Sequence, residues 1–167
     1  MNTNDVRKLY AYNDWANDRI LNAIAALSDE QFTRHIVSSY SSIRETLAHI
    51  AFAEWLWLAR FAGERAEVPE WASGESFAFL RDQLLATAAE RRAYLATLTD
   101  DAIDAVLHYV STEGDPYSMP LADVLIHCAN HSTYHRGQLV TMLRQAGGVP
   151  PNMDFNPFAR WHRANTE

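Results

Sequence analysis

Apolar side chains recur at helical spacing in four long segments of the chain. The first runs from Asn4 to Leu27, the second from Ser42 to about Gly63, the third from about Phe77 to Leu98, and the fourth from Pro120 to Gly147-Gly148. Such spacing predicts helices that bury one face. Four long helices in one chain of this length predict an all-α fold, a four-helix bundle that forms a single domain over residues 1–167.

The predicted helix boundaries carry sequence signals of their own. Ser28 with Gln31, and Ser42 with Glu45, have the three-residue spacing of a capping box. Pro120 suits the first turn of the fourth helix, where no backbone donor is needed.

The segments between the helices also show a pattern. Residues 106–110 are β-prone, and Gly114-Asp115-Pro116 with Tyr117 supplies turn chemistry, so we predict a small hairpin or extended crossover before the last long helix. The connections between helices one and two and between helices three and four are long enough for crossovers. The aromatic-rich stretch from Met153 to His162 is expected to fold back onto the bundle.

Two histidines of the fourth helix, His131 and His135, are four residues apart and so lie one turn apart on one face. At roughly 100° per residue, His135 falls about 20° from the middle of the apolar stripe, His131 about 60° and His127 about 100°. We therefore expect His131 and His135 to form a ligand pair for a metal ion and His127 to lie at the rim of the site.

The second helix carries a third candidate, His49, on a face shared with Thr46, Ala53 and Leu56. A single buried histidine is usually a hydrogen-bonded core residue. Together with His131 and His135, however, it makes a set of inward imidazoles that are costly to bury without a partner, and a metal ion is one such partner.

Three imidazoles are a common ligand set for zinc and related divalent ions, and they leave a coordination position open for water, a thiol or substrate. The sequence differs from the zincin motif because position 132 is Ser rather than Glu. Glu54 and His127 are candidates for a catalytic base. We expect instead a salt bridge for Glu54 and a backbone hydrogen bond for His127, and Cys128 is interpreted as core packing.

Asn13 and Asn17 occupy inward positions in the middle of the first helix. They indicate a buried hydrogen-bond network, the lining of a cavity, or local packing and capping.

Charge and composition exclude some functions. The net charge is -7, which argues against a nucleic-acid partner, since such proteins usually show a basic patch. No apolar run is long enough for a transmembrane helix, and the N-terminus lacks a signal pattern, so we expect no membrane association. The single cysteine cannot form an intrachain disulfide, which favours the cytoplasm.

The segment Asn130-His131-x-x-x-His135-Arg136-Gly137-Gln138 resembles the signature of the DinB/YfiT-like family. The resemblance extends to Asp14-Trp15-Ala16-Asn17, Leu47-Ala48-His49-Ile50 and Arg144-Gln145-Ala146-Gly147. It implies a bundle with up-down-down-up order, a homodimer, and a divalent metal, zinc or nickel, held by three histidines. Carried onto this chain, the ligands are His49, His131 and His135.

We expect four further residues to lie behind the ligands or to line the pocket: His127, Asn130, Asn17 and Gln138. The DinB/YfiT-like family that this chain resembles includes thiol-dependent transferases. The first hypothesis is therefore a metal-dependent transferase or hydrolase. Such an enzyme would activate a thiol or water at the metal and act on a small molecule. The cofactors are then the metal ion and a low-molecular-weight thiol. The alternatives are a non-catalytic metal-binding or stress-related protein and a metal-free helical interaction module.

Overall fold

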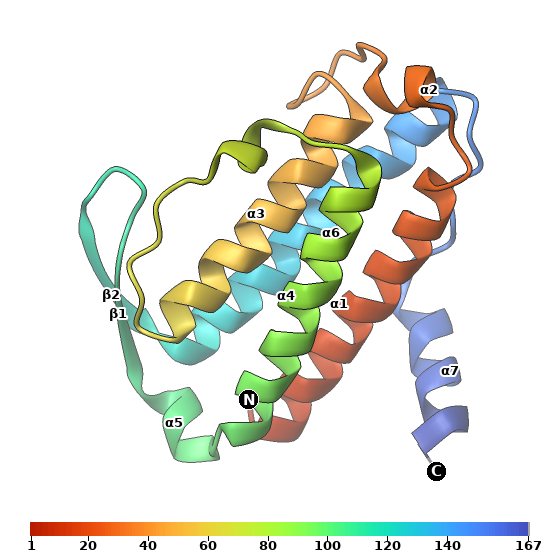
Figure 1. Cartoon of the computed structure of the whole chain (residues 1–167). Helices are drawn as coiled ribbons and strands as arrows, with labels where there is room; N and C mark the ends of the chain where they lie inside the picture. Colours follow the sequence, from red (N-terminus) through yellow and green to blue (C-terminus); the bar gives the residue numbers. More distant parts are fainter. Residues whose placement is uncertain (167) are drawn as a thin grey trace.

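The computed structural model describes residues 1–166 and is dominated by four long helices. They are α1 (Thr3–Ile24), α3 (Ile43–Phe61), α4 (Phe77–Thr97) and α6 (Leu121–Gln145). Figure 1 shows that α1 and α6 run in one direction along the bundle and α3 and α4 in the other. The predicted four-helix bundle with up-down-down-up order is therefore confirmed.

Helix starts follow the capping signals with one exception. Asn2 and Asp5 form a reciprocal capping box on α1, and Ser28 and Gln31 form the predicted one on α2 (Asp29–Thr33). The second predicted box is only half present. The Ser42 side chain accepts from the Glu45 backbone amide, but the Glu45 carboxylate accepts from the backbone and hydroxyl of the preceding residue, Ser41.

Short elements occupy the long connections. A 3-10 turn, η1 (Glu70–Ser73), lies between α3 and α4, and α5 (Asp100–Asp104) follows α4. The predicted hairpin is present as β1 (Val106–Val110) and β2 (Pro116–Pro120), paired antiparallel.

Our placement of Pro120 in the first turn of the last long helix was wrong by one position. Pro120 has an extended ψ of 133°, pairs with Val106 at the end of β2, and precedes the first helical residue. At the end of a ladder, the missing proline N–H costs no hydrogen bond.

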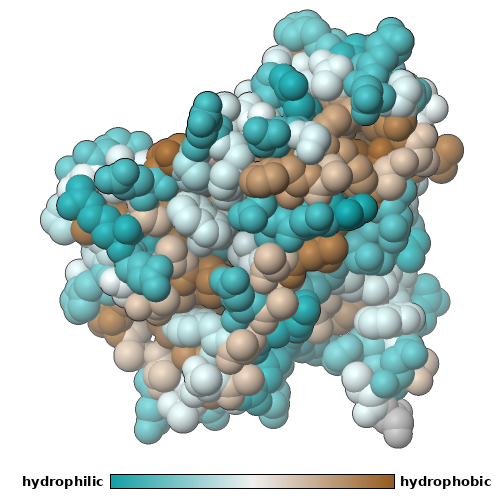
Figure 2. Space-filling model, viewed as in Figure 1, coloured by the Kyte–Doolittle hydropathy of each residue, from teal (hydrophilic) through white to brown (hydrophobic). Residues whose placement is uncertain are grey.

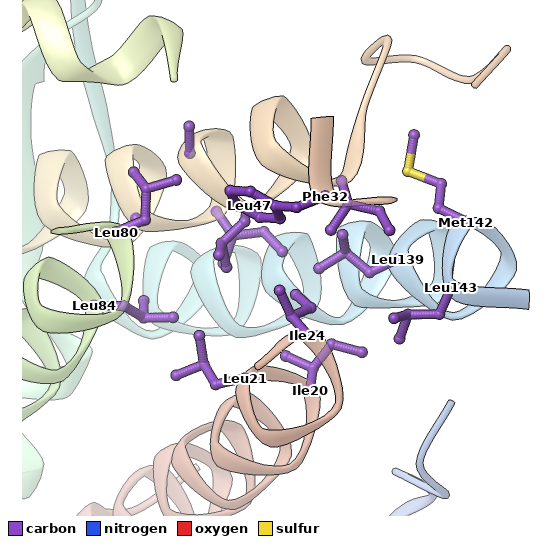
Figure 3. Packing of buried hydrophobic residues seen from close by; sticks show 14 of the residues in the cluster. Ile20, Leu21, Ile24, Phe32, Leu47, Leu80, Leu84, Leu139, Met142 and Leu143 are labelled. Carbon is purple, nitrogen blue, oxygen red and sulfur yellow. The ribbon is translucent and has the colours of Figure 1, made fainter. Parts of the chain in front are cut away.

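The bundle core is divided by a polar layer. One apolar cluster fills the end of the bundle near α2, and Figure 3 shows its side chains converging from α1, α2, α3, α4 and α6. A second cluster fills the other end and includes Tyr10 and Leu125. Along α1, Asn13 and Asn17 fall between Tyr10 and Ile20, so buried polar side chains separate the two clusters.

The C-terminal helix α7 (Phe155–Thr166) returns against α1 as predicted. Phe158 is fully buried and lies 5.5 Å from the Tyr12 ring and 5.7 Å from the Trp15 ring, centroid to centroid. In the space-filling view α7 forms a separate lobe at the edge of the molecule (Figure 2). Among residues 1–166, no helix combines the length and apolar character that crossing a bilayer requires.

Candidate metal centre

The three predicted ligands come together between two antiparallel helices. His49 projects from α3, and His131 and His135 project from α6. Their ligating nitrogens all lie within 4.8 Å of one another. The order of burial follows the helical geometry, since His135 is buried while His131, farther from the centre of the apolar stripe, is only half-buried.

The distances fit a metal ion. The Nε2 atoms of His49 and His131 are 3.1 Å apart. Zinc–nitrogen bonds of about 2.0–2.1 Å in a tetrahedral site separate two ligand nitrogens by roughly 3.3 Å. The ring of His135 lies 4.4 Å from each of the other two rings, centroid to centroid. The three side chains therefore already occupy positions close to those that one ion requires.

The electrostatics keep these imidazoles neutral. Burial, and then the neighbouring His135, lower the pKa of His49 to about 4. Burial and the surrounding histidines likewise lower the pKa of His131 to about 4, and burial lowers that of His135. All three are thus neutral near pH 7, each with one nitrogen lone pair free, which is the state that binds metal. The Nδ1 atom of His131 is buried and has no hydrogen-bond partner among residues 1–166.

Gln138 fixes the orientation of His135. Its carbonyl oxygen accepts from His135 Nδ1 at 2.9 Å, so this nitrogen carries the proton and Nε2 presents its lone pair. The Gln138 amide in turn donates to Ser39 in the loop before α3. Gln138 was expected either behind the ligands or in the lining of the pocket, and the structure places it in contact with His135.

Tyr40 closes the site from the same loop and was not predicted. Its ring stacks on His49 at 4.5 Å with an interplanar angle of 28° and lies 5.7 Å from His135. A residue in an irregular loop has no periodicity that reveals which way it points. The flanking serines, Ser38, Ser39 and Ser41, indicate a loop but not the direction of the Tyr40 side chain.

A buried polar network lies beside the histidines in the middle layer of the bundle. Glu54 is its centre: Oε1 accepts from Asn13, Asn17 and Ser132, each at 2.8–2.9 Å, and Oε2 pairs with Arg91. Burial alone would raise the pKa of Glu54, but Arg91 and the two asparagines lower it to about 2. The salt bridge that sequence analysis favoured for Glu54 is therefore present.

The same network holds α6 in its rotational position. Arg136 donates to the side-chain oxygens of Asn13 and Asn17 at 2.6 and 2.7 Å. Ser132 and Arg136 directly follow His131 and His135 in the sequence, so bonds that fix them also direct the two ligands toward α3. Of the three interpretations of the inward asparagines, the hydrogen-bond network is correct.

The other three predicted pocket residues do not contact the three histidines through hydrogen bonds. Asn17 belongs to the network around Glu54 rather than to the lining of a pocket. The side chain of Asn130 is exposed and makes no hydrogen bond with residues 1–166. His127 is exposed at the rim, 6.0 Å from the His131 ring. It packs edge-on to Trp57 rather than on a backbone acceptor, which corrects our expectation of its role.

Cys128 packs in the core, as predicted, and does not belong to the group of potential metal ligands formed by His49, His131 and His135. It is 2% exposed, and burial raises the pKa of its thiol to about 12.

Comparisons with known proteins show the family of this chain. The chain matches the model of the DinB family over residues 1–167. The chain belongs to the DinB family. It is 28% identical over 156 residues to Protein DinB of Bacillus subtilis (strain 168), with 89% of this chain and 90% of that protein covered.

Two solved structures share the fold of this DinB-family chain. One is a DinB-like protein from Bacillus cereus ATCC 10987, with a TM-score of 0.65, 21% identity, and coverage of 83% of this chain and 91% of that one. The other is a conserved protein from Enterococcus faecalis, with a TM-score of 0.65, 16% identity, and coverage of 81% and 93%. At these identities the likeness shows the fold alone.

Proposed function

We propose that this DinB-family protein binds a divalent metal ion, zinc or nickel, through His49, His131 and His135. The observation that carries the proposal is the convergence of three neutral imidazoles from α3 and α6, with nitrogens within 4.8 Å of one another. Burying such groups without partners is costly. The Nε2 atoms of His49 and His131 face each other at 3.1 Å, and an ion between them would be a common partner for their lone pairs.

We propose further that the site is catalytic. A three-histidine ion leaves a position open, where it can lower the pKa of a bound water or thiol and so supply a nucleophile. The chain's own thiol, on Cys128, is buried and protonated, so a thiol substrate would come from solution as a low-molecular-weight compound. A pocket of about 350 Å³ is lined in part by Tyr134, Gln138 and Met142 and by none of the three histidines, so it offers room for a small molecule beside Gln138, the hydrogen-bond partner of His135.

The test of metal binding is elemental analysis of protein purified without a His tag, beside His49→Ala and His135→Ala. We expect about one divalent ion per chain, lost in both variants. His108→Ala is the matched control, because His108 is exposed on β1 and remote from the ligands in sequence. Absence of metal after reconstitution with zinc and with nickel would contradict the proposal.

The test of catalysis is a screen of the metal-loaded protein for thiol transfer and hydrolysis. We expect an activity that His135→Ala abolishes and His108→Ala retains. Stoichiometric metal without any metal-dependent turnover would favour the non-catalytic, metal-binding alternative.

A further inference from the structure

A second pocket, of about 300 Å³, lies at the C-terminal end of α3, away from the histidines. Its walls come from the last turns of α3, the chain after that helix, and β1, which meet at one side of the bundle in Figure 1. The residues used below are Leu56, Arg60, Arg65, Val68 and Val110. We call it the Arg60 pocket.

Arg60 is the unusual group in this wall. Its side chain is 8% exposed, its Nε is buried without a hydrogen-bond partner, and no described residue makes a hydrogen bond or ion pair with it. The two other buried arginines are different. Arg91 also leaves Nε unpaired, but its terminal nitrogens bond to Glu54 and Asp14, and Arg136 donates to two asparagines and a threonine. Buried charges are ordinarily paired in this way.

Aromatic contacts hold the Arg60 guanidinium without satisfying its donors. Its central carbon lies 4.6 Å from the Trp57 ring centroid and 5.1 Å from that of Tyr109, and those two rings are 5.1 Å apart. These three distances make a nearly equilateral triangle, so both rings lie on one side of the cation. Cation–π contact and the helix C-terminus favour the charge, but the buried Nε–H still lacks an acceptor and no described side chain pairs with the terminal nitrogens.

The surroundings restrict what kind of acceptor can enter. Leu56, Val68 and Val110 give the pocket apolar walls, whereas exposed Glu64 and Glu67 also line it. The exposed Glu113 attracts the Arg60 charge from a distance but does not form a salt bridge with it. Acids at the mouth repel an extended polyanion, while a compact molecule with one anionic group and an apolar body can reach the buried cation.

We propose that the Arg60 pocket binds a small organic acid whose oxyanion, a carboxylate or a phosphate, pairs with the Arg60 guanidinium. A planar guanidinium matches either oxyanion through two parallel N–H donors. The site is separate from the histidines: Arg60 follows His49 by eleven positions on α3, which is roughly 16 Å along the helix axis. The inference does not depend on the proposed metal chemistry.

The experiment is isothermal titration calorimetry at constant ionic strength with benzoate, phenyl phosphate and neutral benzyl alcohol as probes. We expect saturable binding of at least one anion and none of the alcohol. Which anion binds identifies the head group. Arg60→Gln is expected to weaken binding about tenfold or more, the effect of losing a charge-assisted hydrogen bond. Arg65→Gln, an equal charge change at an exposed position on the same pocket, is expected to change it less than about twofold.

Two further variants keep the test decisive. Val110→Trp fills the pocket from the exposed hairpin and is expected to abolish binding even if Arg60→Gln fails to fold. His135→Ala should leave the affinity unchanged, which separates this site from anions held at the histidines. The proposal is overturned if neither anion binds saturably, if folded Arg60→Gln or Val110→Trp binds normally, or if Arg65→Gln or His135→Ala removes binding.

Discussion

His135 differs from His49 and His131 because one of its nitrogens bonds to a side chain outside the three-histidine group. Its Nδ1 donates to Gln138, which leaves Nε2 as the only lone pair for an ion. His49 and His131 instead face each other through their Nε2 atoms. The carboxamide of Gln138 therefore selects the His135 tautomer with a free Nε2 lone pair before any ion binds. We expect this preorganisation to increase the affinity of the site for metal.

Replacing Gln138 with Leu is expected to weaken metal affinity about 10- to 100-fold, the usual effect of losing an outer hydrogen bond to a ligand. The unfolding free energy of the metal-free protein should change by less than about 1 kcal/mol, because Gln138 is half-buried at the surface of α6. Competition with a chelator measures the affinity. The control is Gln145→Leu, an exposed position two turns later on α6, and equal affinities in the two variants would contradict the role given to Gln138.

At the residue scale, the three histidines could be predicted from the sequence, but the hydrogen-bonding residues that hold them in place could not. Spacing alone placed His131 and His135 on an inward face and His127 near the rim. The partners of Glu54 come from positions 37 to 78 residues away, and Arg136 reaches Asn13 across 123 residues. No local pattern encodes such pairings. An arginine at the inward position 91 was the one available signal that a buried carboxylate faced it.

At the scale of the helices, the Glu54 network is what joins all four long elements. Asn13 and Asn17 lie on α1, Glu54 on α3, Arg91 on α4, and Ser132 on α6. Hydrogen bonds require specific partners at specific positions along the helix axes, whereas apolar contacts tolerate small shifts of one helix along another. The network therefore sets the register of the helices beside the metal site.

Changing Glu54 to Gln removes the charge and leaves Arg91 buried with only Asp14, so we expect a loss of about 3–5 kcal/mol in unfolding free energy. The folded-state pKa of Glu54, about 2, is below its ordinary value of 4.5. Its contribution is thus complete above pH 4.5 and is lost as pH falls toward 2.

Urea unfolding across that pH range measures both effects. Wild-type stability should decline more steeply toward acid than that of Glu54→Gln. Glu90→Gln, an exposed position on α4, serves as the control and should follow the wild type. Parallel pH profiles for wild type and Glu54→Gln would disprove the assignment.

Element boundaries were well predicted where local chemistry decides them. The capping box at Ser28 and the hairpin before α6 are both present. Two boundaries differ from expectation because a neighbouring group competes. The Glu45 carboxylate accepts from Ser41 instead of from the Ser42 backbone. Pro120 pairs with β1 as the last residue of β2 instead of beginning the helix.

At the scale of the whole molecule, the three-histidine group joins parts of the chain that are distant in sequence. His49 lies in the first third and His131 and His135 in the last, and each half of the site belongs to a different helix of the bundle. The order of the helices was implied by family resemblance, because hydrophobic periodicity identifies helices without giving their directions.

Binding across α3 and α6 is expected to stabilise the folded state. At an ion concentration about 100 times the dissociation constant the gain is about 2.7 kcal/mol, which corresponds to a rise of about 5–11 °C in Tm for a chain of this size. Thermal scans with zinc or nickel against a chelator measure it. His131→Ala should remove the rise and His108→Ala should keep it. An equal rise in His131→Ala would place the ion elsewhere.

The burial of Cys128 has a practical consequence for studying this protein. The chain contains one cysteine, and its thiol is inaccessible and protonated. Alkylating reagents attack thiolates at accessible positions, so they should leave the native fold unmodified. A cysteine introduced at the exposed Val149 would then carry a spectroscopic label at a single site without any background substitution.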